Sequence, residues 1–425
     1  MRSLLVAAAV FLVGCTTPAA KPETSYVRDV QPLIERSCQG CHTSGGVAPM
    51  AFETPEQVIA AAPLIEAAVK GGRMPPFFAA KSCNQYQNDL RLSDDEKALL
   101  SKWVSEGAPR GDDADAQHAE PVALPSVRAA VSMSIGGAFD VRKMNAIDNY
   151  QCFVMDPGNV NDLQVVGYEI TPGNATVLHH LLAYVVPPEQ VAQLQALDDA
   201  APGLGYPCQS GGVGIEGAVR NQIAGWVPGQ YPNRLPAGTA LTLVGGSKLV
   251  VQVHYNLNAL YDASVSPFDE TKLSLEFAPA GSFTPAKILP MLKPNLAIPA
   301  GVKNSVQTLE VAVPQPFREA TVYRAMGHAH QLATQVKLEV IRQGGSAECV
   351  LDNPNWDFNW QRDYTLTRPI TLKQGDKLRI TCTYDNSPEN QAVENGQQRQ
   401  PVDVSWGESS YDEMCMTYLT FTSPK

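Results

Sequence analysis

The sequence lacks clusters of basic residues, and it lacks long hydrophobic segments beyond its N-terminus. Its 425 residues carry a formal net charge of −11, with 32 Lys and Arg against 43 Asp and Glu. Nucleic-acid binding depends on concentrated positive charge, so this composition argues against a nucleic acid as partner. The one long apolar run, residues 4–13, is shorter than the roughly 20 residues of a membrane-spanning helix. The rest of the chain is expected to be soluble and to form several domains.

The short apolar run follows Arg2 and ends in the sequence LVGC at Cys15. This arrangement resembles the lipobox of a bacterial lipoprotein, in which a signal peptide, here residues 1–14, is removed and the cysteine is lipidated. The resemblance implies a location in the bacterial cell envelope, periplasmic or associated with the outer membrane, with a membrane anchor on Cys15. Exported proteins meet oxidising surroundings, so the nine cysteines are expected to be lipidated, bound to a cofactor or paired.

Composition divides the rest of the chain into a helical part and a β part. Residues 24–110 are rich in Ala, Leu, Glu and Lys, and residues 111–127 form an acidic, proline-bearing stretch without periodicity that predicts a linker. After residue 127, short stretches of alternating apolar and polar residues are separated by turn signals, which is typical of all-β sandwiches. Roughly 300 residues are long for one sandwich, so we expect two in tandem, at 128–275 and 276–425.

The helical part contains the sequence CQGCH, with Cys38, Cys41 and His42. In a C-x-x-C-H motif the two thiols attach covalently to haem and the adjacent histidine ligates its iron. Met74, in the sequence GGRMPP, is the expected sixth ligand, and Met50 is the alternative. This part of the chain therefore resembles a small all-α cytochrome c domain, of the kind fused to bacterial oxidoreductases. The resemblance implies a covalently bound haem c that transfers electrons and does not bind substrate.

Histidine is scarce, and five of the seven histidines lie in the β part. His328 and His330 stand two positions apart, so both would point to one face of a strand and could chelate one ion. His179 and His180 are adjacent, and neighbours in a regular strand point to opposite faces, so both can reach one metal only at a bulge or a strand end. His254 lies on the polar side of an alternating segment. Each of these alone would suit a surface or structural histidine, but together they indicate metal binding.

These histidines and the sequences around them resemble the copper type II monooxygenases, the family of dopamine β-monooxygenase and peptidylglycine α-hydroxylating monooxygenase. The resemblance covers about residues 128–425 and implies two jelly-roll-like sandwiches, each holding one copper ion. It rests on the segments VLHHLL (177–182), VQVHY (251–255), GHAH (327–330) and DEMC (412–415). The ligands that it implies are His179, His180 and His254 for the first copper, and His328, His330 and Met414 for the second. A thioether ligand favours Cu(I), the state that must meet dioxygen, and Met416 is a less suitable candidate on the same side.

The same resemblance implies two disulfides, Cys152–Cys208 and Cys382–Cys415. The second of these would anchor the segment that delivers Met414. Cys83 and Cys349 remain, and we expect them to pair across domains. Connectivity itself does not follow from the sequence.

The region expected to bind substrate departs from the peptide-hydroxylating members of the family. Those members bind the carboxylate of their substrate with an arginine and an asparagine, and the matching positions here hold Met326 and Met416. A tyrosine of the family is retained as Tyr418. Loss of the bidentate cation removes the main anchor for a carboxylate, so the sequence predicts a less charged or more apolar substrate.

The resemblance implies a monooxygenase that inserts one atom of O2 into an unactivated C–H bond of a small organic substrate and reduces the other atom to water. It assigns electron storage to the first copper and the oxygen chemistry to the second, with Tyr418 as a further catalytic candidate. The fusion suggests that the haem relays electrons to copper, from ascorbate or a periplasmic redox protein. One alternative is a non-catalytic electron-transfer or copper-binding lipoprotein. A zinc hydrolase is the other, and it is disfavoured because catalytic zinc seldom takes a thioether.

Overall fold

The computed structural model describes residues 21–425, except 45–47, 121, 123–124, 145–146, 210–211, 229, 280, 314–318, 395–396 and 424–425. The predicted signal peptide and Cys15 lie outside the described residues. Contacts divide the chain into two compact units. The helical unit comprises Met1–Ser44, Met50–Pro75 and Leu92–Pro121, and the β unit comprises Gly45–Pro49, Pro76–Arg91 and Val122–Lys425.

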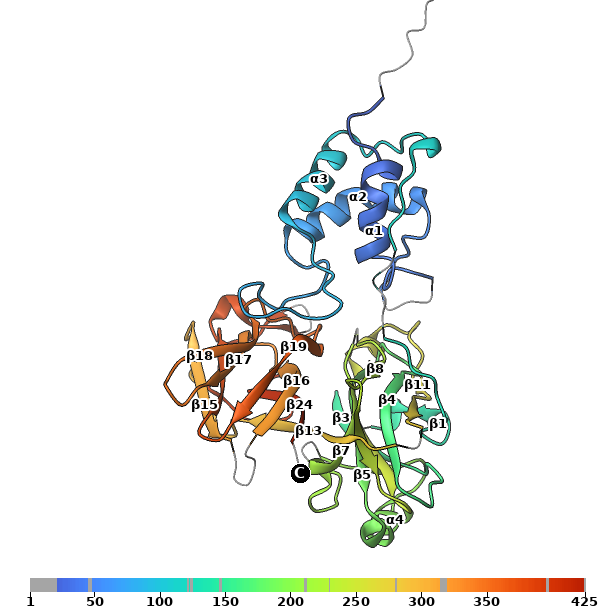
Figure 1. The fold of residues 1–425 in the computed structure, drawn as a ribbon, viewed down its shortest axis with the longest axis vertical. Helices are drawn as coiled ribbons and strands as arrows, with labels where there is room; N and C mark the ends of the chain where they lie inside the picture. Colours follow the sequence, from blue (N-terminus) through green and yellow to red (C-terminus); the bar gives the residue numbers. More distant parts are fainter. Residues whose placement is uncertain are drawn as a thin grey trace, which may run out of the picture. The chain divides into compact units, whose positions relative to one another are not determined.

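The helical unit contains α1 (Gln31–Ser37), α2 (Pro55–Lys70) and α3 (Asp94–Ser105), preceded by the π-helical turn η1 (Tyr26–Val30) (Figure 1). Both α2 and α3 begin with a capping box, formed by Thr54 with Gln57 and by Ser93 with Glu96, which satisfies backbone N–H groups at the helix start. The apolar faces of these helices surround the fully buried Trp103. Helices thus form in the part of the chain for which composition predicts them.

The first sandwich of the β unit has two facing layers around one core. One layer contains β1 (Val131–Ser134), β12 (Lys272–Phe277), β4 (Leu163–Thr171), β8 (Asn233–Arg234) and β9 (Thr239–Leu243). The other contains β7 (Gln222–Trp226), β5 (Leu178–Val186), β10 (Lys248–Asn256), β3 (Asp148–Met155) and β6 (Tyr206–Pro207). Alternate side chains of both layers, such as Val253 and Leu273, are completely buried between them. Helix α4 (Val191–Asp199) packs Leu194 against the outer side of the second layer.

The second sandwich follows the same principle and is joined to the first by a shared strand. One layer contains β13 (Thr284–Leu292), β24 (Met416–Thr422), β16 (Glu319–His328) and β19 (Tyr364–Lys373), and the other contains β15 (Ser305–Ala312), β20 (Lys377–Tyr384), β17 (Ala333–Ile341) and β18 (Ala347–Asn353). Strand β13 pairs with β24 and also with β7 and β9. Hydrogen bonding is therefore continuous between the two sandwiches. Three short pairs lie outside this path: β2 (Phe139–Asp140) with β11 (Phe268–Asp269), β14 (Ala297–Ile298) with β23 (Val404–Ser405), and β21 (Val393–Glu394) with β22 (Gln397–Gln398).

The division into units corrects the predicted boundaries. Residues 76–91, predicted within the cytochrome domain, belong to the β unit, and we call them the strap. Residues 111–121, predicted as linker, belong instead to the helical unit. There the η2 turn (Asp113–Asp115) is followed by Gln117, whose N–H donates to the Val27 carbonyl over 2.8 Å. Composition missed both because the strap and the acidic stretch are fixed by contacts with distant residues.

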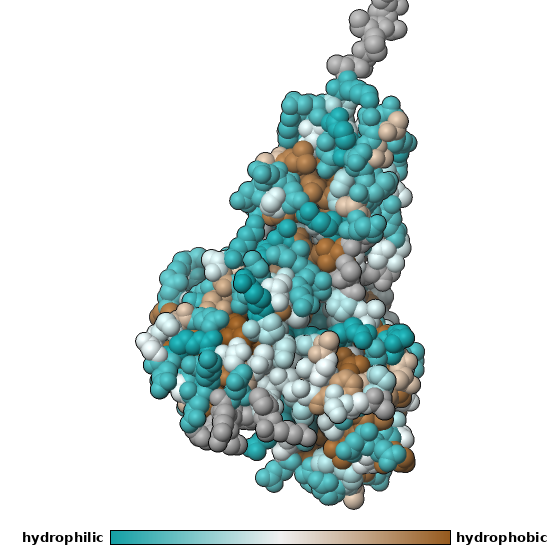
Figure 2. Space-filling model, viewed as in Figure 1, coloured by the Kyte–Doolittle hydropathy of each residue, from teal (hydrophilic) through white to brown (hydrophobic). Residues whose placement is uncertain are grey.

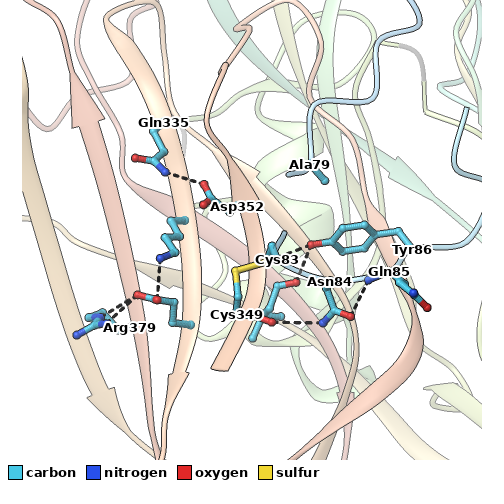
Figure 3. The surroundings of a disulfide bond; sticks show 12 residues. Ala79, Cys83, Asn84, Gln85, Tyr86, Gln335, Cys349, Asp352 and Arg379 are labelled. Atoms are coloured by element: carbon cyan, nitrogen blue, oxygen red, sulfur yellow. Dashed lines mark hydrogen bonds and ion pairs between the residues drawn. A yellow bond between two sulfur atoms is a disulfide. The ribbon is translucent and has the colours of Figure 1, made fainter. Parts of the chain in front are cut away.

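Aromatic side chains of the strap complete the core of the second sandwich. Phe77 and Tyr86 are each only 4% exposed, and each ring centroid lies 5.2 Å from that of Tyr364 in β19. The Tyr86 hydroxyl donates to the Val350 carbonyl over 3.0 Å (Figure 3). The strap therefore contributes side chains to the hydrophobic core of the second sandwich.

All three expected disulfides are present. Cys152–Cys208 joins β3 to the segment after β6, and Cys382–Cys415 joins β20 to the residue before β24. Cys83–Cys349 ties the strap to β18 (Figure 3). The open expectation for this last pair is thus confirmed, although both cysteines lie within the β unit.

No helix among the described residues is long and apolar enough to cross a membrane. On the face shown in Figure 2, hydrophobic residues appear in small separate groups among hydrophilic ones.

Candidate metal centres

Three histidines of the first sandwich bring their Nδ1 atoms together. The Nδ1 atom of His179 lies 3.2 Å from Nδ1 of His180 and 3.3 Å from Nδ1 of His254. The Nδ1 atoms of His180 and His254 are 3.4 Å apart. His254 in β10 faces His180 in β5, but the next residue, Tyr255, faces Leu178. His179 is therefore the extra residue of a β-bulge, which turns two adjacent histidines toward one point. The predicted irregularity and the predicted grouping are both confirmed.

A hydrogen bond fixes which nitrogen of His254 carries the proton. Its Nε2 lies 3.1 Å from Oδ1 of Asp148, so Nε2–H donates and the lone pair remains on Nδ1. Burial raises the pKa of Asp148, but the bonds from His254, Ser410 and Asn256 outweigh it and lower the pKa to about 2. Asp148 is thus a carboxylate that orients His254 for metal binding.

The second ligand set lies on the second sandwich at the ends of two neighbouring strands. His328 is the last residue of β16 and faces Met416, the first residue of β24. His330 and Met414 lie just outside these strands, which corrects the prediction that one strand carries both histidines. The ring centroids of His328 and His330 are 5.4 Å apart. Met414 is 4% exposed and lines the same cavity as His328.

Hydrogen bonds at Nδ1 fix the tautomer and the ring orientation of these two histidines. His328 Nδ1 donates to Oε1 of Gln361 over 2.6 Å, and His330 Nδ1 donates to the Asp412 carbonyl over 3.0 Å. Both lone pairs are therefore on Nε2, the opposite nitrogen from the one used in the first set.

A buried carboxyl group connects the two segments that carry the second set. Glu413 is 0% exposed and accepts hydrogen bonds from the N–H groups of His330 (2.8 Å), Leu332 (2.6 Å) and Met414 (3.2 Å). One side chain thus fixes the position of His330 relative to Met414.

The two ligand sets are neighbours. The ring centroids of His180 and His328 are 5.9 Å apart, and the Phe358 ring lies 4.7 Å from His179 and 5.8 Å from His330. A cavity of about 140 Å³ is lined by members of both sets and by Met326, Met416 and Tyr418. The residues at the expected substrate positions therefore do line a cavity beside the ligands, and they make it largely apolar.

Burial keeps four of the ligand histidines neutral at neutral pH, as metal binding requires. It lowers the pKa of His179 to about 3 and that of His328 to about 4, and it places the pKa values of His180 and His330 well below the usual range. Protons therefore compete poorly with a metal ion at these sites.

We expect the metal-free protein to lose stability steeply on acidification. In the unfolded chain these four histidines bind protons below a pH of about 6.5, whereas in the folded state their pKa values are far lower. Each of them therefore lowers the free energy of unfolding by up to about 1.4 kcal/mol for every pH unit below about 6.5. Chemical denaturation between pH 7 and pH 5 measures this slope. In the double variant His328→Gln, His330→Gln the slope should fall by about half. A pH-independent free energy of unfolding in the wild type would contradict this assignment.

The predicted haem residues lie together in the helical unit. A turn places the N–H groups of Cys41 and His42 on the Cys38 carbonyl, at 3.1 and 3.0 Å. His42 Nδ1 lies 2.9 Å from the Met50 carbonyl, so its Nε2 is left for a metal ion. Met74 and Cys38 pack against the same hydrophobic core. Two thiols, an oriented imidazole and a thioether packed against the same core as Cys38 fit the needs of a c-type haem.

Sequence reasoning missed the residues that orient the ligands. Asp148, Gln361 and Phe358 come from segments far from any motif, and their roles arise only from folding. Glu413 carried a signal, because it is an acidic residue directly before the expected ligand Met414.

Comparison with known proteins agrees with this geometry. Residues 287–425 match the family described as copper type II ascorbate-dependent monooxygenase, C-terminal domain. Dopamine beta-hydroxylase of Equus caballus is 22% identical over 322 residues, covering 71% of this chain and 48% of the relative. The corresponding protein of Homo sapiens is 22% identical over 294 residues (64% and 43%), and tyramine beta-hydroxylase of Caenorhabditis briggsae is 24% identical over 267 residues (59% and 41%). The chain spans less than half the length of these relatives.

Among solved structures, the major capsid protein P2 from Bacteriophage PM2 aligns over 69% of this chain and 97% of its own, with a TM-score of 0.22 and 9% identity. Similarity at this level carries no argument about function.

Proposed function

We propose that the chain is a copper-dependent monooxygenase that hydroxylates an unactivated C–H bond of a small organic molecule with O2. The observation that carries the proposal is the meeting of two ligand sets, three Nδ1 atoms within 3.4 Å of one another and an H-x-H pair with a thioether. His180 of the first set and His328 and Met414 of the second line one cavity. Copper at these positions would supply the one-electron chemistry that activates dioxygen. The family match of residues 287–425 supports the assignment.

The residues of the chain divide the work between the two sets. His179, His180 and His254 offer three neutral imidazoles, a closed set suited to holding an electron-storing copper. The second set adds the soft thioether of Met414, which favours the reduced ion. Met326 and Met416 would hold the apolar part of a substrate and exclude water, and Tyr418 of β24 lines the same cavity.

Oxygen-18 labelling tests this function without knowledge of the substrate. Copper-loaded protein and ascorbate are incubated under ¹⁸O2 with a metabolite extract, and mass spectrometry searches for products that gain a single ¹⁸O atom. The matched control is His328→Ala, which removes one ligand of the second set. We expect a labelled product with the wild type only. Copper binding at both sets without any labelled product would favour the non-catalytic electron-transfer alternative.

We further propose that a haem c bound at Cys38, Cys41 and His42, with Met74 as sixth ligand, passes electrons to the copper ions. The proposal rests on the fusion of the two units in one chain and on the fit of these residues to haem. Ascorbate or a periplasmic redox protein would reduce the haem. Lipid on Cys15 would anchor the protein to a membrane of the bacterial cell envelope.

Anaerobic mixing tests the relay. Reduced haem in protein loaded with Cu(II) should reoxidise in a single-turnover reaction, seen as the loss of its sharp visible band. Protein with zinc in place of copper is the control and should keep the haem reduced. Persistence of reduced haem beside Cu(II) would refute the relay while leaving the oxygenase proposal intact.

A further inference from the structure

A second cavity of the β unit has a lining that the proposed chemistry does not use. It has a volume of about 510 Å³ and is bounded by the strap, by residues 230–237 and by parts of β16 and β19. Gln230 and Asp363 line both this cavity and the smaller one beside the metal ligands. The two cavities are therefore neighbours with a shared wall.

The lining is positively charged. It includes three arginines, Arg234, Arg324 and Arg362, and a single carboxylate, Asp363. Arg234 forms an ion pair of 2.8 Å with Glu276 outside the cavity. Asp363 accepts hydrogen bonds from Gln230 (2.9 Å) and Asn233 (3.3 Å). Within the described chain, neither Arg324 nor Arg362 has a carboxylate within 4.0 Å.

Both remaining guanidinium groups are buried and incompletely bonded. Arg324 is 5% exposed and donates to the Thr365 hydroxyl (3.0 Å) and the Arg234 carbonyl (2.9 Å), but its Nη1 has no partner among the described residues. Arg362 is 7% exposed and lies over the rings of Phe77 and Tyr231, at 4.9 and 5.3 Å, and its Nη1 likewise has no partner there. Asp363 interacts electrostatically with both guanidinium groups without forming an ion pair with either. A buried cation without an ion-pair partner is costly, and planar guanidinium forks match oxyanions.

We propose that this cavity binds a small organic oxyanion, a carboxylate or an enediolate, held by Arg324 and Arg362. The remaining lining is rich in amides and hydroxyls, including Gln87, Asn88 and Thr367, so hydroxyl groups on the ligand would also find partners. The volume suits a molecule of metabolite size. Arg324 stands four positions before His328 and lines a different cavity from Met326, so this site is separate from the position where the sequence predicts a lost carboxylate anchor.

The anion could come from two sources with the same chemistry. It could be one end of a substrate whose apolar end enters the smaller cavity, or it could be a separate reductant molecule. The shared wall of Gln230 and Asp363 is compatible with both.

Calorimetric titration of the full-length, copper-loaded and reduced protein under anaerobic conditions tests the site. The probes are ascorbate, succinate and acetate, and because nothing turns over, the result does not depend on the proposed hydroxylation. We expect at least one probe to bind with a Kd below about 1 mM, and Arg324→Gln or Arg362→Gln to weaken it at least about tenfold. Arg379→Gln, in a distant ion pair with Glu339, is the matched control.

The variant Gln87→Glu tests the site even if the variants of the buried arginines fail to fold. Gln87 is exposed and lines the cavity, so the added charge should repel the probe without disturbing the core. Gln398→Glu, on the exposed strand β22, adds the same charge elsewhere and should not weaken binding. Competition between succinate and the substrate whose product gains ¹⁸O would identify the anion as part of the substrate, and tight binding of ascorbate alone would identify a reductant. Failure of all three probes to bind, or binding unchanged in all three cavity variants, would overturn the proposal.

Discussion

Replacing Met414 with leucine should reduce hydroxylation by at least about 100-fold while leaving the three-histidine site loaded. The change keeps an apolar side chain of similar size at a position that is only 4% exposed, so the fold should persist. It removes the sulfur, the only soft donor of the second set, and with it the preference for Cu(I). Product formation and bound copper measure the two effects separately, and bound copper should fall from about two equivalents toward one.

The matched control for this variant is Met133→Leu. Met133 is also a buried methionine, 8% exposed, but it lies in the core of the first sandwich away from both ligand sets. It should retain both copper ions and full turnover. Normal turnover in Met414→Leu would show that the thioether is not a ligand that the reaction needs, and the division of roles between the two sets would fail.

Replacing Glu413 with alanine should cost about 3–5 kcal/mol of stability and should release copper from the second set. Three N–H groups, of His330, Leu332 and Met414, donate to this fully buried carboxyl group. Alanine leaves all three without an acceptor, and an orphaned buried donor is costly. Thermal unfolding and copper content measure the effect.

Glu413→Gln separates the loss of hydrogen bonds from the loss of charge. It keeps one acceptor oxygen and the size of the side chain, so its stability should lie between those of the wild type and the alanine variant. Burial raises the pKa of Glu413 to about 8, although the N–H donors act in the opposite sense. Folding therefore favours the protonated form, and this group should cost the wild type stability as pH rises from about 4.5, its ordinary pKa, to about 8, with no further change above that value. That loss should be absent in the glutamine variant, and equal pH dependence in both would contradict the assignment.

Sequence patterns predicted the parts of the site that depend on local chain geometry. Two adjacent histidines can share a metal ion only at an irregularity, and the bulge at His179 provides it. Alternation placed His254 on the side of β10 away from the core residues Val253 and Tyr255. The disulfides followed from the family resemblance and not from spacing, and they too are present.

What the sequence could not predict depends on contacts between distant segments. Nothing near Gln361 or Asp148 indicates that their side chains orient His328 and His254. The strap resembles its neighbours in composition, and its place in the β unit depends on the fit of Phe77 and Tyr86 against Tyr364. Side-chain packing of this kind has no periodic signature along the chain.

The helical unit is built from chain segments on both sides of the strap, so the two units are not consecutive in the sequence. A protease that cleaves once near residue 122 should yield two fragments that migrate as one species on a non-reducing gel and separate only after reduction of Cys83–Cys349. A single cut near residue 122 therefore does not release the helical unit. Deleting the chain up to that residue would also remove Phe77 and Tyr86 from the core of the second sandwich, so the helical unit cannot be replaced by simple truncation.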